Sequence, residues 1–254
     1  MTDSTVYMGI EVTAGARPLT LAVLNGRLDV LKVETLKLEE LIEVILEYPS
    51  SVCGIDAPSG VNKELLAEPD YRENLGLDPR KKTYNRYRVC EYELRRRRIS
   101  IYSTPADKEK ASKWMLTGWE LYDRLRGEGY SSYPAESSRR LFEVHPHAAF
   151  TVLVKKRPYS KNSMEGLLQR QLVLYESGLD IHDPMQALEE WTRHHMLTGK
   201  LRMEGIYSHV ELDALCAAYT AFVLDKNPQK ITAVGDSGEG QIILPTAELL
   251  DRYN

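Results

Sequence analysis

The sequence predicts an α/β fold with a mixed sheet, in which three antiparallel strands are followed by parallel strands and helices flank the sheet. Two observations support this prediction. Asn25-Gly26 joins two apolar runs and is typical of a hairpin turn, because both residues tolerate a positive φ. Further along, apolar residues at helical spacing over 38–46 precede a short apolar run at 52–56. A helix between two strands can return the second strand parallel to an earlier one.

The predicted elements follow one another along the chain. We expect strands at 6–12, 19–24 and 28–33, a helix at 38–46 and a fourth strand at 52–56. Residues 60–110 are rich in tyrosine, arginine, proline and charge with little periodicity, which indicates an insertion carrying short helices. Ser208 and Glu211 have capping-box spacing and predict a helix start. The remaining predictions are helices at 113–125, from 164 onward, at about 184–196 and at 246–253, and strands at 140–145, 230–234 and 241–244. We expect one domain over residues 1–254.

Composition places the chain among ordinary globular proteins. It has 254 residues, a net charge of −4 and a hydrophobic fraction of 43%. No apolar stretch approaches the roughly 20 residues of a membrane helix, and no secretory signal is visible. Cys53, Cys90 and Cys216 lie far apart without a CxxC pair, which predicts reduced thiols in a cytoplasmic protein and argues against a thiolate zinc site.

Positive charge is concentrated between residues 86 and 98. A basic patch there could bind the phosphates of a nucleic acid even on an acidic protein. The alternative is a solvated helix face whose arginines pair with Glu91 and Glu93, and the sequence leaves both interpretations open. The arginines considered for phosphate binding are Arg88, Arg95, Arg96, Arg97 and Arg98.

Four acidic residues stand in unusually apolar surroundings: Glu11, Asp56, Glu143 and Asp213. If the first and fourth strands are parallel neighbours, Glu11 and Asp56 emerge side by side at their ends. Asp213 lies on a helix face of small residues, which suits close packing against a sheet. Each acid also has an ordinary structural explanation, as a turn former, a helix-start residue, a salt-bridge partner or, for Glu143, a support for His145. Taken together, they favour a site.

Crowded carboxylates repel one another unless a positive charge lies between them. Oxygen ligands from Glu11, Asp56 and Asp213 suit Mg²⁺ or Mn²⁺. Two such ions about 4 Å apart can orient a water and stabilise a leaving oxygen in phosphodiester cleavage. A transition-metal site on His145 and His147 lacks a third partner at a recognisable spacing, so we expect these histidines to brace the acidic centre by hydrogen bonds.

Five ordered blocks between about residues 9 and 245 resemble a known family. They read GIDAPSG, RVCEYELR, EVHPHAAF followed by a lysine-containing stretch, ELDALCAAYTA and GDSGEGQIILP. The sequence is similar to the domain-of-unknown-function family 429, whose members are described as predicted nucleases with a ribonuclease H-like fold. The resemblance implies a ribonuclease H-like sheet with an acidic centre in which Asp56, Glu143 and Asp213 occupy the family's acidic positions. Glu11 stands at the first-strand position, where such folds usually carry aspartate, and Glu91 stands where aspartate is also expected.

Three functions follow as hypotheses. The first is a metal-dependent nuclease or other phosphodiester hydrolase that uses Glu11, Asp56, Glu143 and Asp213 with Mg²⁺ or Mn²⁺. The second is a nucleotide-binding phosphotransferase of the actin and sugar-kinase type, suggested by the GIEVTAGA and GDSGEG segments. Against it, those proteins usually pair two copies of the sheet, and the sequence shows one. The third is an interaction module that kept the fold and lost activity, for which Glu11 in place of aspartate is the main support.

Overall fold

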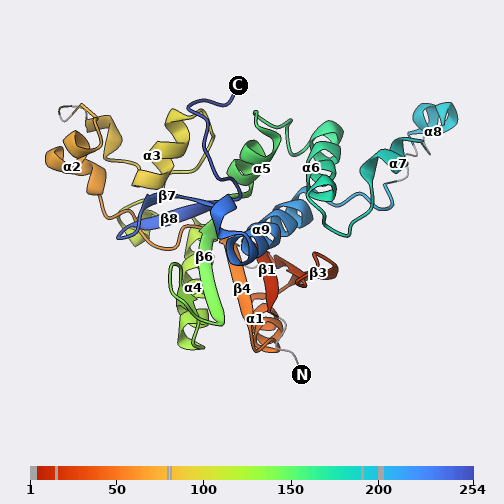
Figure 1. The fold of residues 1–254 in the computed structure, drawn as a ribbon, viewed down its shortest axis with the longest axis horizontal. Helices are drawn as coiled ribbons and strands as arrows, with labels where there is room; N and C mark the ends of the chain where they lie inside the picture. Colours follow the sequence, from red (N-terminus) through yellow and green to blue (C-terminus); the bar gives the residue numbers. More distant parts are fainter. Residues whose placement is uncertain (1–4, 15–16, 79, 81, 190–191, 200–202) are drawn as a thin grey trace.

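The computed structural model describes residues 5–14, 17–78, 80, 82–189, 192–199 and 203–254, and the strands in these ranges form one sheet (Figure 1). The strand order is β3-β2-β1-β4-β6-β8-β7, with β5 beside β6. The first three strands pair antiparallel, β1, β4, β6 and β8 run parallel, and β7 is antiparallel to β8. This confirms the predicted mixed α/β sheet, which is consistent with a ribonuclease H-like fold. The strands are β1 (Val6–Glu11), β2 (Leu19–Leu24), β3 (Val30–Leu36), β4 (Ser51–Asp56), β5 (Ser131–Ser132), β6 (Arg139–Val144), β7 (Thr232–Asp236) and β8 (Gly240–Leu244).

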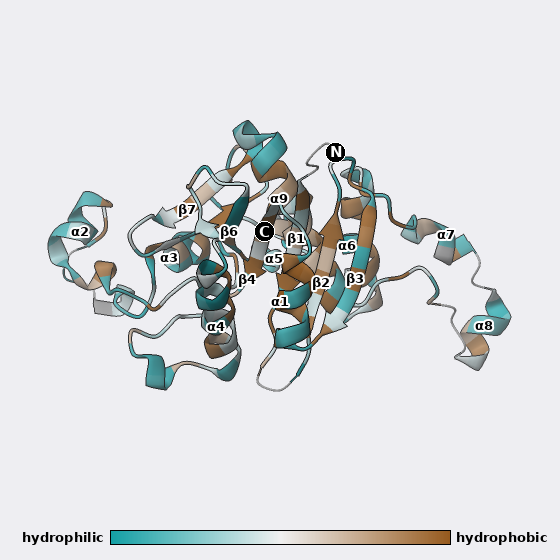
Figure 2. Cartoon of the chain, turned by 90° about the horizontal axis from the view of Figure 1, so that it is seen from below, coloured by the Kyte–Doolittle hydropathy of each residue, from teal (hydrophilic) through white to brown (hydrophobic). Residues whose placement is uncertain are grey.

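Helices cover both faces of the sheet, because alternate strand residues point to opposite sides. Met8 and Ile10 of β1 belong to the buried cluster under α1 and α4, whereas Tyr7 belongs to the cluster under α5, α6 and α9. The central strands are therefore hydrophobic on both sides, and Figure 2 shows them between the more hydrophilic outlying helices α2 and α8. The helices named in this paragraph have the following bounds: α1 (Leu38–Leu46), α2 (Pro69–Asn74), α4 (Lys113–Gly127), α5 (Pro146–Val154), α6 (Met164–Glu176), α8 (Arg193–Thr198) and α9 (His209–Lys226).

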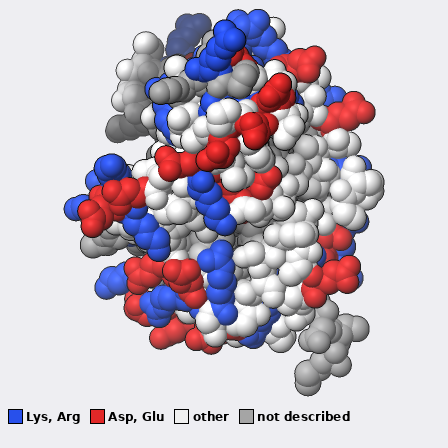
Figure 3. Space-filling view, turned by 90° about the vertical axis from the view of Figure 1, so that its left-hand side faces the viewer, with Lys and Arg blue, Asp and Glu red and all other residues white. Residues whose placement is uncertain are grey.

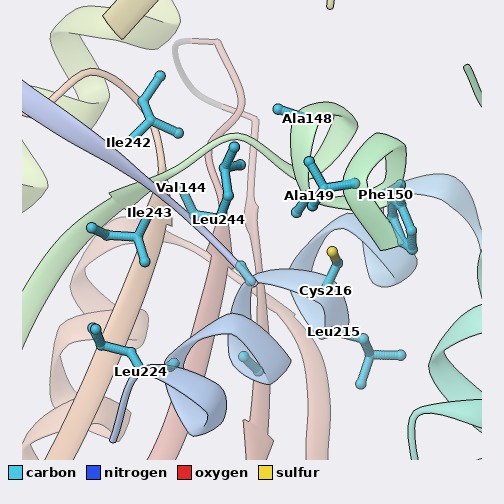
Figure 4. Packing of buried hydrophobic residues seen from close by; sticks show 14 of the residues in the cluster. Val144, Ala148, Ala149, Phe150, Leu215, Cys216, Leu224, Ile242, Ile243 and Leu244 are labelled. Atoms are coloured by element: carbon cyan, nitrogen blue, oxygen red, sulfur yellow. The ribbon is translucent and has the colours of Figure 1, made fainter. Parts of the chain in front are cut away.

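Helix α9 is the central helix of its layer. Ser208 caps its start, as predicted, by accepting a hydrogen bond from the backbone N–H of Glu211. Its small and apolar side chains pack in one cluster with residues of the sheet and of α5, and Figure 4 shows Cys216 of α9 near Phe150 of α5, with Leu244 of β8 beside Val144 of β6. This packing fixes the height at which the first turn of α9 stands above the ends of β1 and β4.

Two strand glycines permit the close approach of α9. A Cβ added to Gly9 would lie 1.9 Å from the carbonyl oxygen of Ala214 and 2.3 Å from the backbone nitrogen of Ala218. A Cβ on Gly54 would lie 2.9 Å from the carbonyl oxygen of Ala217. These contacts are with backbone, which cannot rotate away, so α9 is in direct contact with the two strands that carry Glu11 and Asp56.

We expect Gly9→Ala to lower the free energy of unfolding by about 3 kcal/mol, at the upper end of the usual cost of overpacking a core, because α9 must shift. Urea unfolding followed by circular dichroism measures this loss. The matched control is Gly127→Ala, near the end of α4, where nothing lies within 4 Å of the added Cβ and φ is ordinary. Equal stability of the two variants would contradict the proposed close packing of α9.

The insertion carries short helices, as predicted. It contains α2, α3 (Val89–Arg96) and the 3₁₀ turns η1 (Leu65–Ala67), η2 (Lys82–Tyr84) and η3 (Lys108–Lys110). Helix α3 packs against β7, where a Cβ on Gly235 would lie 2.6 Å from the Cβ of Cys90. The insertion is therefore anchored to the far end of the sheet from β3.

Two predicted helices are wrong. The expected helix at 184–196 is divided into α7 (Pro184–Glu189) and α8, where Thr192 caps a new helix start by accepting from the N–H of His195. The closing segment 246–253 is not helical. Tyr253 is buried and its N–H donates to the carbonyl of Arg97, a long-range contact that no local pattern reveals. No helix in the described ranges is long and apolar enough to cross a membrane.

Candidate active site

Three of the four predicted acids meet at the carboxyl ends of β1 and β4. Glu11 and Asp56 are direct neighbours in the parallel pairing of these strands, so their side chains leave the same face of the sheet. Asp213 reaches them from the first turns of α9. The structure therefore brings Glu11, Asp56 and Asp213 together as the sequence predicts.

Burial and the neighbouring carboxylates strongly perturb Glu11 and Asp213. Burial raises the pKa of Glu11 well above its ordinary value, and the charges of Asp56 and Asp213 raise it further. Burial also raises the pKa of Asp213. The Oε2 atom of Glu11 is buried and has no hydrogen-bond partner among the described residues. A buried, unpaired carboxylate oxygen is costly, so the raised pKa favours a proton on Glu11, and a cation bound there would displace that proton.

Lys161 supplies part of the missing positive charge. Its ammonium donates a hydrogen bond of 2.9 Å to Oδ2 of Asp213, and its side chain is 43% exposed. Burial alone would lower the pKa of Lys161, but the charge of Asp213 raises it above its ordinary value. Lys161 is therefore a permanent cation at one edge of the cluster.

His145 contacts the cluster from the start of α5. Its Nδ1 lies 3.5 Å from Oδ1 of Asp56, and its Nε2 lies 3.1 Å from the carbonyl oxygen of Ser100. The ring is also edge-on to Tyr102, with centroids 5.3 Å apart. His145 thus lies beside the acidic centre, but its Nδ1 has no hydrogen-bond partner among the described residues, so bracing by His145 and His147 stays a prediction.

A cleft opens above the carboxylates. One cavity of about 480 Å³ is lined by Asp56, Asp213, Lys161 and His147, among others. A second, of about 170 Å³, is lined by Glu11, Asp56 and Trp114. The two cavities share Asp56, Tyr102 and His145, so they adjoin at the carboxylates. The carboxylates therefore line a cleft that a ligand can enter.

Glu143 does not join this cluster, contrary to the sequence-based expectation. It is paired with Ile55 in the sheet, so it leaves the face opposite to that of Asp56. Its carboxylate accepts two hydrogen bonds from the guanidinium of Arg88, one from the N–H of Ser59 and one from the hydroxyl of Tyr102. Glu143 therefore links β6 to the insertion through a buried ion pair.

The predicted phosphate-binding arginines are engaged within the protein. Arg88 is fully buried between Glu91 and Glu143, which corrects its assignment as a surface phosphate ligand. The alternative interpretation, pairing with Glu91 and Glu93, matches the structure better. Figure 3 shows acidic and basic side chains interspersed on the side of the molecule where α2, α3 and α4 lie. The other arginines have these partners: Arg95 the carbonyl of Ile101, Arg96 and Arg97 the carboxylate of Glu93, and Arg98 the side chain of Asn254.

A divalent cation fits the pair Glu11 and Asp56 better than all three carboxylates. In the described part of the chain, no group of three or more His, Cys, Asp or Glu side chains is arranged to hold a metal. Asp213 already contacts the ammonium of Lys161, whereas the buried Oε2 of Glu11 is unbonded. Mg²⁺ and Mn²⁺ commonly use one or two protein carboxylates and complete their shell with water and substrate phosphate. The donor set therefore suits a hard cation at Glu11 and Asp56.

The two segments that suggested a phosphotransferase make internal contacts. The hydroxyl of Thr13 donates to the carbonyls of Arg17 and Pro18, and residues 15 and 16 of GIEVTAGA lie outside the described residues. In GDSGEG, the buried carboxylate of Glu239 accepts from the N–H groups of Lys63 and Val89. This turn is bound to the insertion, at a distance along the sheet from Glu11 and Asp56.

Residue-by-residue reasoning did not identify Lys161 or Arg157, which lines the same cavity. The available signal was the segment KKRPYSK at 155–161, which carries four basic residues and begins four residues after the EVHPHAAF block. It was less conspicuous than the run of arginines at 95–98, although it lies at the carboxylates.

The whole arrangement was compared with known proteins. No curated protein and no solved structure shows significant similarity to this chain. A family model, described as a protein of unknown function (DUF429), matches residues 9–231 and so spans β1, β4, β6 and α9. Those elements carry all four predicted acids. The chain therefore belongs to the DUF429 family.

Proposed function

We propose that the protein is a metal-dependent phosphodiester hydrolase, a nuclease that acts in the cleft above Glu11, Asp56 and Asp213. The observation that carries this proposal is the convergence of three carboxylates on an open cleft: Glu11 and Asp213 are buried, Asp56 is partly buried, and one buried oxygen of Glu11 is left unbonded. A cluster of this kind is expensive to maintain without a cation, so its presence at the cleft favours a functional role over a structural one.

Glu11 and Asp56 would hold Mg²⁺ or Mn²⁺, because their oxygens are hard ligands on adjacent strand ends. When bound, such a cation would activate a water molecule and neutralise charge on a phosphoryl oxygen. The two-ion arrangement considered from the sequence becomes a one-ion arrangement in this proposal, because Lys161 stands beside Asp213.

The other polar residues of the cleft would position a substrate phosphate and neutralise its charge. Lys161 is fixed by Asp213 and faces the cavity, so its remaining N–H groups can donate to a phosphate. Asp213 fixes the position of this ammonium. On the other side, Nδ1 of His145 lies 3.5 Å from the carboxylate of Asp56. Burial and the neighbouring cations lower the pKa of His147 to about 4, so its ring is neutral at pH 7.

Nucleic acid is the proposed partner and the cytoplasm the proposed location. Cys53, Cys90 and Cys216 are free and buried, which agrees with a reducing compartment. The phosphotransferase and the inactive module remain alternatives: stabilisation by ATP would support the former, and the absence of any response to Mg²⁺ or Mn²⁺ would support the latter.

A cleavage panel tests the proposal. The full chain is incubated with single-stranded, duplex, hybrid and branched nucleic acids, each in Mg²⁺, Mn²⁺ or EDTA. We expect metal-dependent cleavage of at least one substrate and a loss of about 10²-fold or more in Asp213→Asn, because Lys161 then loses its fixed position. Cleavage in EDTA, or an equal rate in Asp213→Asn, would show that another site or a contaminant is responsible.

A further inference from the structure

The segment Lys155–Lys161 forms a basic loop between α5 and α6, at the edge of the cleft. Lys155, Lys156 and Arg157 are exposed, and no carboxylate in the described ranges pairs with any of the three. Arg157 lines the cavity together with Lys161. This contrasts with residues 95–98, where every arginine has a partner within the protein. The basic loop is therefore a positive surface beside the cleft that is available to an anionic ligand.

The basic loop also presents an aromatic ring. Tyr159 lies between Arg157 and Lys161 in the chain and is 58% exposed, among the most exposed large side chains of the described residues. Exposed aromatic side chains interleaved with basic ones are the pattern by which proteins bind single-stranded nucleic acid, since bases stack on the ring while cations contact the backbone. Neither fold stability nor the acidic centre requires this ring to be in solvent.

The backbone that carries Tyr159 is held in place. The buried guanidinium of Arg170 donates to the carbonyls of Tyr159, at 3.0 Å, and of Gly166. The N–H of Tyr159 donates to the side-chain oxygen of Gln169. A Cβ on Gly166 would lie 1.8 Å from the carbonyl oxygen of Ser160, so the loop rests directly on the first turn of α6. A loop fixed in this way loses little conformational entropy when a ligand binds.

A pair of aromatic rings also lines the cleft. Trp114 and Tyr102 are partly exposed, contact each other edge to face at 5.0 Å, and line the smaller cavity with Glu11 and Asp56. Trp114 lines only the smaller cavity, Arg157 and Lys161 line only the larger one, and Asp56 and Tyr102 line both, so Asp56 lies between Trp114 and the two cations. Bases in a duplex are stacked on one another and are not free to stack on both ends of this cleft.

We propose that the basic loop 155–161 makes the protein selective for single-stranded nucleic acid, with a base stacked on Tyr159 and backbone phosphates bound by Arg157 and Lys161. This inference rests on the proposed function, because it places the scissile phosphate at the carboxylates. Trp114 provides the stacking surface for a base on the far side of that phosphate. The occupant is thus a flexible single strand that crosses the cleft from the basic loop to Trp114.

The inference is tested by measuring the affinity for oligonucleotides under conditions that prevent metal-dependent cleavage. Fluorescence anisotropy in EDTA measures the affinity of the full chain for a labelled single-stranded oligonucleotide, as DNA and as RNA, and for the same sequence as a duplex. We expect tighter binding of the single strand. Tyr159→Ala should weaken it by about 5- to 100-fold, the range for losing one stacked base, and Tyr159→Phe should restore it. Arg157→Gln should reduce the salt slope by about 0.7, as expected for one phosphate contact to a single strand.

The matched control is Tyr175→Ala, which removes another partly exposed tyrosine, near the other end of α6. Unchanged affinity in Tyr159→Ala, an equal loss in Tyr175→Ala, or duplex binding as tight as single-strand binding would each overturn the inference. Binding to vesicles with anionic lipid, but not to oligonucleotides, would assign the loop to a membrane surface instead. Failure of the proposed function can be distinguished from failure of this inference. If the oligonucleotide binds through Tyr159 but no metal supports cleavage, the binding inference holds and the proposed hydrolase function is wrong.

Discussion

Replacing Arg88 by methionine is expected to lower the free energy of unfolding by about 3–5 kcal/mol, the cost of leaving a buried charge without its partner. Arg88 is fully buried, and its guanidinium contacts the carboxylates of both Glu91 and Glu143. Methionine fills a similar volume but leaves two buried carboxylates with only their neutral donors. Urea denaturation at neutral pH, followed by circular dichroism, measures the change.

The matched control is Arg95→Met, in the same arginine-rich segment. Arg95 is exposed and donates to a backbone carbonyl, so its loss should cost less than about 1 kcal/mol. A triple variant, Arg88→Met with Glu91→Leu and Glu143→Leu, should recover much of the stability, because apolar replacement of an entire buried ion group is often neutral. If Arg88→Met were as mild as Arg95→Met, the buried network would not hold the insertion to β6.

Most of the sheet could be predicted because its signals are local. The Asn25-Gly26 turn, the apolar face of α1 and the cap at Ser208 each depend on residues a few positions apart. The connection itself is two residues longer than expected: Leu28 has a positive φ, and the side chain of Asn25 accepts from the N–H of Asp29. Strand β3 consequently begins at Val30 rather than at residue 28.

The meeting of Glu11 and Asp56 could be predicted because parallel neighbours end at the same edge of a sheet. The face of the sheet on which Glu143 lies could not be predicted, because it depends on the exact pairing register between β4 and β6. One residue along a strand changes the face, so Glu143 beside Ile55 points away from Asp56. Its partner Arg88 lies in the insertion, whose path over the sheet has no periodic pattern to read. The same reason explains why an arginine run that looked like a surface patch contains a fully buried member.

Lys161 shows a different limit of sequence reasoning. A cluster of carboxylates predicts a neighbouring positive charge but not its source, because a metal ion or a lysine side chain can each neutralise the carboxylates. The structure supplies one ammonium for Asp213 and leaves the buried oxygen of Glu11 unbonded. The carboxylate oxygen without a partner among the described residues is therefore that of Glu11, beside Asp56, and this decides which substitution is the most informative.

Asp56→Asn is expected to abolish the stabilisation of the protein by Mn²⁺ and to lower metal-dependent cleavage by at least about 10²–10³-fold. Asparagine keeps the shape of the side chain but removes the charge that, with Glu11, would hold the cation. At a Mn²⁺ concentration 100 times the dissociation constant, the unsubstituted protein should gain about 2.7 kcal/mol. For a chain of this size that corresponds to a rise in melting temperature of roughly 5–10 °C. The cleavage loss corresponds to several kcal/mol of transition-state stabilisation supplied by a bound metal.

Thermal unfolding with Mn²⁺ and with EDTA separates binding from catalysis in this variant. The matched control is Asp123→Asn, whose carboxylate is 68% exposed on α4 and pairs with Arg126 away from the cleft. It should retain both the Mn²⁺ response and cleavage. A Mn²⁺ response in Asp56→Asn equal to that of Asp123→Asn would place the cation elsewhere and remove Asp56 from the proposed site. Loss of the response with cleavage intact would mean that the stabilising ion is not the one that supports the reaction, because one ligand cannot be essential to binding and irrelevant to the chemistry of the same ion.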